Sequence, residues 1–158
     1  MENSVYLLPM TAEMFHEYYK EYENDLDLYV DKCEYTPYTY DEERVNRYIH
    51  RQIDQKRKVF AIMLGDEIAG EIVIKNIVDG ESATLSISMK NAKYKDRGLG
   101  TKAEKLAIQY VFYELDIPVI YADSVVSNTR SQHVLEKVGF KLIKEEGGFK
   151  FYRIDRHN

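Results

Sequence analysis

The chain lacks several features that would have indicated particular classes of protein. Its 158 residues include one cysteine, Cys33, no tryptophan and three prolines. A single cysteine excludes an internal disulfide and fits a reducing cytoplasm, where we expect the protein to be located. No apolar run approaches the ~18 residues that a membrane span needs, and residues 1–4 lack the basic start of a signal peptide. We therefore expect no membrane association.

The charge balance argues against a further class of protein, the general nucleic-acid binders. The formal net charge is −5, from 22 basic and 27 acidic residues, whereas a general nucleic-acid binder needs clustered Lys and Arg. The four histidines, at 16, 50, 133 and 157, are dispersed without metal-ligand spacing, so no metal site is expected. No linker, internal repeat or low-complexity tract interrupts the chain. We predict a single domain over residues 1–158.

Hydrophobic periodicity predicts an α+β fold in the order β-α-α-β-β-β-α-β-α-β-β. Thr11 is suited to cap a helix ending near Asn24, and Thr39 with Glu42 has the spacing of a capping box. Strands over residues 59–64, 68–78 and 82–89 form an antiparallel meander. The next helix has an apolar face made of Ala103, Leu106, Ala107, Tyr110 and Val111. Strand 118–126, a helix capped by Asn128, and strands 140–144 and 149–154 follow.

The segment Lys95-Asp96-Arg97-Gly98-Leu99-Gly100-Thr101 joins the meander to this helix. Its two glycines carry no Cβ and let backbone approach a ligand closely. The following helix directs free N–H groups and the positive end of its dipole into the same loop. This arrangement is typical of a phosphate site.

Three kinds of phosphate ligand compete for the loop. A Walker A loop needs a different glycine spacing. A dinucleotide fold fits better, because Gly98, Gly100 and Ala103 satisfy G-x-G-x-x-[GA] and Asp123 ends the next strand. Against it, the preceding strand is half polar, whereas a central parallel strand is almost all apolar, and the meander is antiparallel.

The third ligand is acyl-coenzyme A. A second block spans residues 128–140 and reads N-T-R-S-Q-H-V-L-E-K-V-G-F. With the glycine loop, it resembles the two conserved blocks of the GNAT superfamily of acyl-CoA-dependent N-acyltransferases, which read [QR]-x-x-G-x-[GA] and N-x-x-[SA] followed by E-K-x-G-F. The second block is most similar to the branch of ribosomal-protein N-terminal acetyltransferases. The resemblance implies a mixed, mostly antiparallel central sheet with flanking helices.

The resemblance also implies how acetyl-CoA is held. Backbone amides of the loop would bind the pyrophosphate, with Lys95 in the place of the usual Gln or Arg. The end of the preceding strand would pair with the pantetheine arm, Asn128 would hydrogen-bond it, and Ser131 would lie near the sulfur. The implied cofactor-binding residues are Ile87, Ser88, Met89, Lys95, Asp96, Arg97, Gly98, Leu99, Gly100, Thr101, Asn128 and Ser131.

Direct transfer to a primary amine needs a base for the amine and an acid for the leaving thiolate. The tyrosine that many family members place before E-K-x-G-F is Leu135 here, so Ser131 is the candidate acid. Glu71 and Asp123 are the candidate bases, and the competing interpretation of each is a solvent-facing carboxylate on the sheet. The absence of that tyrosine, and of the Glu that family members often carry in the strand before the loop, leaves a non-catalytic acyl-CoA-binding or sensing module as the alternative.

Residues 13–40 interleave carboxylates, among them Asp25, Asp27 and Asp31, with seven tyrosines. Carboxylates and aromatic faces suit a cationic amine. We expect the acceptor to be a small amine or a protein N-terminus, bound here; the alternative is a solvated helix face. The alternating residues 149–154 are expected to form a sheet edge that could pair in a homodimer.

Overall fold

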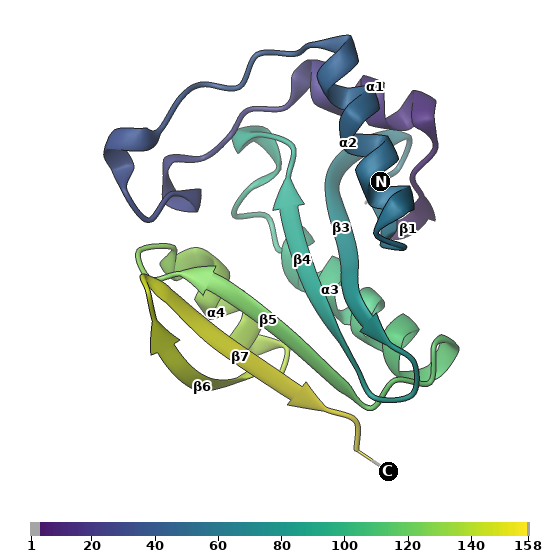
Figure 1. The fold of residues 1–158 in the computed structure, drawn as a ribbon, viewed down its shortest axis with the longest axis vertical. Coiled ribbons are helices and arrows are strands. Elements are labelled where there is room, and N and C mark those ends of the chain that lie inside the picture. Colours follow the sequence, from purple (N-terminus) through teal and green to yellow (C-terminus); the bar gives the residue numbers. More distant parts are fainter. Residues whose placement is uncertain (1–3, 158) are drawn as a thin grey trace.

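The computed structural model describes residues 4–157, which form one seven-stranded sheet with helices on both faces (Figure 1). The strands are β1 (Val5–Pro9), β2 (Lys58–Leu64), β3 (Glu67–Val78), β4 (Ser82–Met89), β5 (Val119–Val125), β6 (Lys141–Glu146) and β7 (Phe149–Asp155). The helices are α1 (Ala12–Glu21), α2 (Glu42–Asp54), α3 (Leu99–Gln109) and α4 (Thr129–Lys137). Short 3-10 turns η1 (Leu26–Leu28), η2 (Lys32–Glu34) and η3 (Ala92–Tyr94) lie between them, and a π-helical turn, η4 (Tyr110–Glu114), continues α3. The predicted α+β class is confirmed.

The sheet opens in its middle. The strand order is β1-β2-β3-β4-β5-β7-β6, and only β4 and β5 are parallel neighbours. They pair over three positions alone, from Ser82 with Val119 to Thr84 with Tyr121, and then separate. Figure 1 shows the two halves of the sheet meeting at one end and diverging toward the other. The glycine loop follows β4 and α4 follows β5, so α3 and α4 both begin at the open end.

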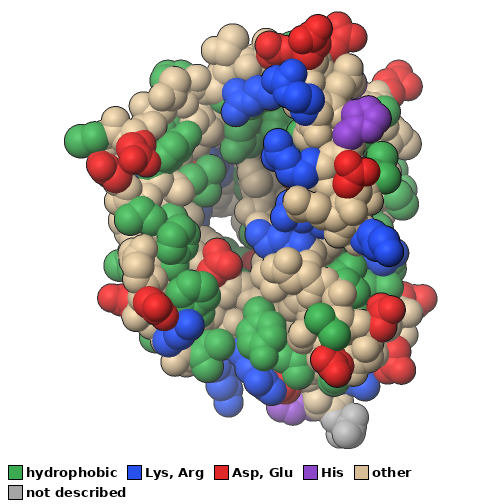
Figure 2. Space-filling view, viewed as in Figure 1, with side chains coloured by type: hydrophobic (Ala, Val, Ile, Leu, Met, Phe, Trp, Pro, Cys, Tyr) green, Lys and Arg blue, Asp and Glu red, His purple; other side chains and the backbone are tan. Residues whose placement is uncertain are grey.

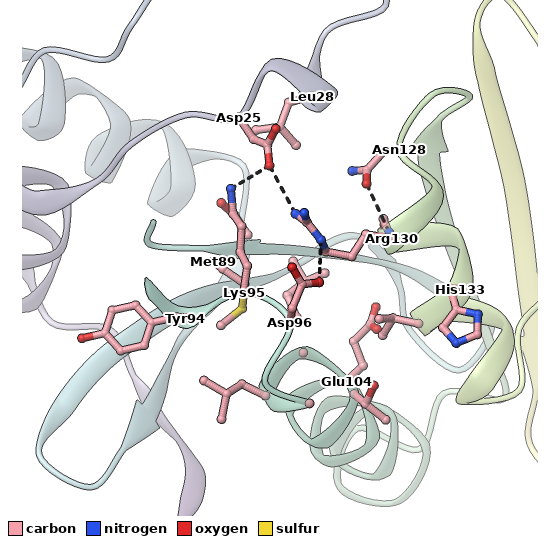
Figure 3. A pocket seen from close by; sticks show the side chains of 18 of the residues that line it. Asp25, Leu28, Met89, Tyr94, Lys95, Asp96, Glu104, Asn128, Arg130 and His133 are labelled. Atoms are coloured by element: carbon pink, nitrogen blue, oxygen red, sulfur yellow. Dashed lines mark hydrogen bonds and ion pairs between the residues drawn. The ribbon is translucent and has the colours of Figure 1, made fainter. Parts of the chain in front are cut away.

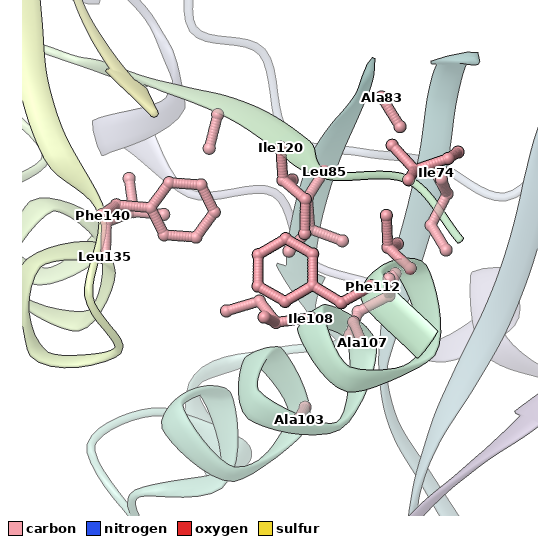
Figure 4. Packing of buried hydrophobic residues seen from close by; sticks show 14 of the residues in the cluster. Ile74, Ala83, Leu85, Ala103, Ala107, Ile108, Phe112, Ile120, Leu135 and Phe140 are labelled. Carbon is pink, nitrogen blue, oxygen red and sulfur yellow. The ribbon is translucent and has the colours of Figure 1, made fainter. Parts of the chain in front are cut away.

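The main core lies between the sheet and α3. Ile72 and Ile74 of β3 and Ile120 of β5 are fully buried against this helix, and Figure 4 shows the packing around Ala107 and Phe112. The predicted helical face is shifted. Leu106 is 41% exposed, and the buried face is instead made of Ala103, Ala107, Ile108 and Val111. Helix α3 thus turns small residues toward the sheet, which lets its axis approach closely.

Side-chain caps set where three helices begin. The Thr11 hydroxyl accepts a hydrogen bond from the Met14 amide, and Asn128 accepts one from the Ser131 amide, as predicted. The predicted Thr39 cap is wrong. Asp41 is the N-cap of α2, and its carboxylate accepts from the amides of Glu43 and Arg44. Asp is as good a cap as Thr, and it stands immediately before the first helical residue.

The predicted edge strand is also wrong. Strand β7 lies between β5 and β6, and the edges of the sheet among residues 4–157 are β1 and β6. The two-residue turn Gly147-Gly148 has positive φ at both positions, which folds β6 back along β7 as a hairpin. Among the same residues, no helix combines the length and apolar character needed to cross a membrane.

Candidate active site

A cavity of about 790 Å³ occupies the open end of the sheet, between the end of β4, the glycine loop and the start of α4. All but one of the predicted cofactor residues line it. The exception is Arg97, whose guanidinium donates to the carbonyl of Lys93 outside the cavity. Segments that the sequence places about 30 residues apart therefore converge on one cleft, as the two-block pattern predicted.

The glycine loop has the backbone geometry of an anion site. Gly98 is the N-cap of α3 with φ of 75°, a conformation that L-residues rarely adopt, and no side chain caps this helix end. A Cβ built at Gly100 would meet only the Ile87 Cδ1 atom, at 4.0 Å. The first turn of α3 therefore presents its free amides to the cavity, and neither glycine places a side chain between these amides and a ligand.

The edge of β4 that faces the cavity also carries unpaired backbone groups. The Lys90 amide donates to the carbonyl of Ala69, and the ladder to β3 is regular from Met89 back to Thr84. Since N–H groups alternate between the two edges of a strand, the amides of Ile87 and Met89 point away from β3. They point into the slot where β5 has diverged.

A network of ion pairs crosses the mouth of this cavity (Figure 3). Asp25 of the α1–α2 connection lies 2.7 Å from Lys95 Nζ and 3.4 Å from Arg130, and Arg130 also pairs with Asp96 at 2.9 Å. Burial raises the pKa of Asp25, but hydrogen bonds from Lys95 and the Asp27 amide outweigh it and leave the pKa below its ordinary value. Asp25 thus belongs to the cofactor cleft and not to an acceptor site.

We expect Asp25→Asn to tighten acetyl-CoA binding, because the variant removes a carboxylate that competes with phosphate for Lys95 and Arg130. Exposed ion pairs contribute about 0.2–1 kcal/mol, and the Asp25–Lys95 pair is partly buried, with side-chain exposures of 23% and 17%, so we expect a dissociation constant lower by about five-fold. Asp31→Asn is the matched control, since Asp31 likewise caps a 3-10 turn, through the Cys33 amide. Titration calorimetry with acetyl-CoA measures both; unchanged or weaker binding in Asp25→Asn alone would contradict the prediction.

A second cavity, of about 390 Å³, adjoins the first on the α1 and α2 side of the sheet. Tyr22 and Leu28 line both cavities, so the second opens toward the end of the slot. Figure 2 shows this hollowed face, with Lys and Arg side chains gathered along one side of the hollow. The remaining residues that line it are Tyr19, Asn24, Tyr29, Tyr38, Arg44, Val45, Tyr48 and Arg51.

Glu71 of β3 does not line the second cavity itself, but it contacts two of the tyrosines that do. It is 4% exposed, and its carboxylate accepts hydrogen bonds from the hydroxyls of Tyr19, at 2.8 Å, and Tyr48, at 2.5 Å. Burial raises the pKa of Glu71, while the two tyrosine hydrogen bonds oppose the shift. Burial also raises the pKa of both phenols, so they stay protonated and donate. Glu71 is therefore not a solvent-facing carboxylate, which was the competing interpretation.

The other predicted catalytic residues are differently placed. Ser131 lines the first cavity in the first turn of α4, consistent with a position near the cofactor. Asp123 is exposed on β5, opposite Phe151 of β7, and lines neither cavity. Glu71 and Asp123, equal candidates in the sequence, are thus distinguished by their surroundings.

Sequence reasoning missed three residues that line the cavities. Arg44 and Arg51 of α2 flank Tyr48 at spacings of four and three, which places all three on one helical face; this periodicity was available in the sequence. Glu104 of α3 is 2% exposed, lines the first cavity, and its Oε2 atom has no hydrogen-bond partner among the described residues. Burial raises the pKa of Glu104 to about 8. Glu104 stands three and four residues before the buried Ala107 and Ile108, so helical periodicity was the signal that could have placed it on the buried face.

Comparisons with known proteins agree with this geometry. The family model described as an acetyltransferase (GNAT) domain matches residues 4–141, so the chain belongs to the GNAT acetyltransferase family. A probable N-acetyltransferase, YjcK of Bacillus subtilis, is 29% identical over 100 residues, which are 61% of this chain and 55% of that protein. The spermidine N(1)-acetyltransferase of Escherichia coli K12 is 27% identical over 97 residues, 61% and 50% of the two chains.

This chain therefore spans about half the length of the curated relatives that it matches. Among solved structures, the spermidine N-acetyltransferase of Vibrio cholerae, in complex with CoA and spermine, has a TM-score of 0.74 and 17% identity. The match covers 96% of this chain and 95% of that one, and it confirms the GNAT fold. These matches support the family and not the narrower branch of ribosomal-protein acetyltransferases.

Proposed function

We propose that the protein is an N-acetyltransferase that moves the acetyl group of acetyl-CoA directly to a small primary amine. The observation that carries the proposal is the divergence of β4 from β5 beside an uncapped, glycine-lined start of α3. The slot offers unpaired strand amides to an extended amide-containing arm, and the helix start offers unpaired amides to a pyrophosphate. Coenzyme A carries both groups, in that order along its length.

Two adjoining cavities support direct transfer. With the cofactor in the first cavity, an amine in the second would reach the thioester past Tyr22 and Leu28, which line both. The amine nitrogen attacks the carbonyl carbon, and an amide of the β4 edge stabilises the oxyanion. The C–S bond then breaks, and the thiolate takes a proton through the hydroxyl of Ser131, the candidate acid, which regains a proton from water.

The attacking amine must also lose a proton, and Glu71 is the base that we assign. Its carboxylate lies behind the phenols of Tyr19 and Tyr48, which line the acceptor cavity. A phenol oxygen can accept the amine proton while its own proton passes to Glu71, so the proton ends on the buried carboxylate and neutralises it. The raised pKa of Glu71 brings it closer to neutral pH, as a base that must accept a proton requires.

The size of the second cavity favours a small acceptor over a protein N-terminus. Its volume, about 390 Å³, is in the lower part of the range of small-molecule sites, and the α1–α2 connection lines part of it through Asn24 and Tyr29. A protein N-terminus remains the second candidate, from the resemblance of residues 128–140 to ribosomal-protein acetyltransferases. Assembly as a homodimer is a further proposal, with the exposed Leu142 and Ile143 of edge strand β6 available for contact.

Thermal melting with acetyl-CoA, free CoA, ATP and NAD tests the cofactor. A ligand at 100 times its dissociation constant adds about 2.7 kcal/mol. We expect both CoA forms to raise the melting temperature and ATP and NAD not to. Gly100→Val should abolish the shift with little change in the unliganded melt, because a Cβ at Gly100 has only one neighbour, at 4.0 Å. A shift with NAD, or none, would overturn the proposal.

Thiol release in the presence of amines then separates an enzyme from a binding module. Acetyl-CoA binding followed by amine-dependent release of free CoA supports the transferase. Binding without release for any amine would favour the non-catalytic acyl-CoA-binding module.

A further inference from the structure

From the second cavity we infer the class of acceptor: a small amine that also carries an anionic group, a carboxylate or a phosphate, on a flat or apolar body. The inference rests on the proposed function and specifies its substrate. It starts from the charges on the cavity wall, which differ from those that the sequence suggested.

The wall carries positive and no negative charge. Arg44 and Arg51 line the cavity from α2, and its described lining contains no aspartate or glutamate. Of the carboxylates expected here, Asp25 pairs with Lys95 and Arg130, Asp31 caps η2, and Asp27 lines neither cavity. Glu71 is shielded by the phenols that donate to it. A polycation would meet two guanidinium groups and no exposed counter-charge.

The arginines are arranged to bind an anion. They stand seven residues apart on α2, on the same face as Tyr48, and both are exposed. The Arg44 guanidinium lies over the Tyr38 ring at 5.0 Å, which fixes the plane of its donors. Planar guanidinium donors match carboxylate and phosphate oxygens in pairs. Neither arginine has a carboxylate partner among the described residues.

The tyrosines account for the body of the acceptor. Tyr19, Tyr22 and Tyr38 form a connected set of rings, with centroids 5.1–5.7 Å apart. Such rings present apolar faces to a flat ligand and hydroxyls to its polar atoms. Positive charge nearby also helps the chemistry, because it lowers the pKa of a bound ammonium group and favours the neutral amine that attacks.

The test compares matched pairs of amines that differ in the anion. Tyrosine is compared with tyramine, and glucosamine 6-phosphate with glucosamine, while spermidine represents a polycation. For the wild type we expect kcat/KM at least ten-fold higher for the anionic member of one pair, and spermidine to be a poorer substrate than that member. The pair that responds identifies carboxylate or phosphate.

Substitutions on α2 test whether the preference for the anionic amine comes from the two arginines of the second cavity. Arg44→Gln with Arg51→Gln should reduce the preference to near one, by raising KM for the anionic amine more than KM for the neutral one. Arg47→Gln on the same helix is the control, since Arg47 is exposed and does not line the cavity. Titration of CoA-bound protein with N-acetyltyrosine and N-acetyltyramine, and with the two N-acetylated glucosamine compounds, gives the preference without turnover.

Failure of the inference is distinct from failure of the proposed function. Turnover or product binding that favours spermidine or the neutral amines would overturn the anionic acceptor and leave the acetyltransferase intact. Equal preference in wild type and the double variant would overturn it as well, as would product titrations in which no anionic compound binds. The absence of CoA binding, or CoA binding without amine-dependent release of free CoA, would overturn the function itself.

Discussion

Replacement of Glu71 by Gln is expected to lower kcat by about 10²–10⁴-fold, the usual contribution of a positioned general base. Glutamine has the same shape, and its oxygen can accept from one tyrosine hydroxyl while its NH2 group donates to the other, but it cannot take the amine proton. Because Glu71 lies outside the cofactor cavity, the KM for acetyl-CoA should not change. Steady-state thiol release with saturating amine gives both constants.

Asp123→Asn discriminates between the two candidate bases. Asp123 is exposed and lines neither cavity, so its replacement should leave kcat near the wild-type value. Loss of activity in Asp123→Asn together with full activity in Glu71→Gln would reverse the assignment. Circular dichroism of both variants excludes misfolding as the cause of any loss.

The pH profile offers a second measure of the same base. The base acts when unprotonated, so kcat rises with pH through the pKa of Glu71, which burial raises. Tyr48→Phe removes a hydrogen bond that lowers this pKa, and the acid limb should therefore move to higher pH. A limb that does not move would mean that another group governs the profile.

The sequence predicted most of the local backbone features that border the first cavity, because these features depend on nearby residues. Gly98, Gly100 and Asn128 act through backbone conformation and helix caps, which depend on residues within one turn. The order and approximate bounds of the strands followed from alternation for the same reason. The N-cap of α2 is Asp41 and not the predicted Thr39. The two residues are close neighbours with similar N-cap propensity, so the sequence alone did not distinguish them.

The acceptor half depends on contacts between distant segments, which one sequence does not reveal. Glu71 meets Tyr19 and Tyr48 from separate helices, 52 and 23 residues away. Asp25 appeared to belong to an acidic cluster, yet it pairs across 70 residues with Lys95. Composition located the acidic and aromatic segment correctly but not which charges face the cavity.

Glu104→Gln is expected to stabilise the protein, and increasingly so as the pH rises. Glu104 is buried with an unpaired oxygen, and its pKa is raised from 4.5 to about 8. Between these values the unfolded chain releases the proton while the folded chain keeps it. The free energy of unfolding of the wild type therefore falls with pH relative to the variant, by about 1.4 kcal/mol per pH unit.

The full difference at pH 9 is expected to be about 5 kcal/mol, since the shift is about 3.5 pH units. Total stabilities of single domains are about 5–15 kcal/mol, so an effect of even half this size is measurable by urea unfolding at pH 5, 7 and 9. Glu81→Gln, at an exposed position, controls for the general loss of negative charge. Below pH 4.5 the Glu104 carboxyl group is neutral in the folded and in the unfolded protein. The variant should then have no higher free energy of unfolding than the wild type. A difference between variant and wild type that is independent of pH would mean that Glu104 is solvated in the folded protein, and that the cleft floor between α3 and α4 is open to water.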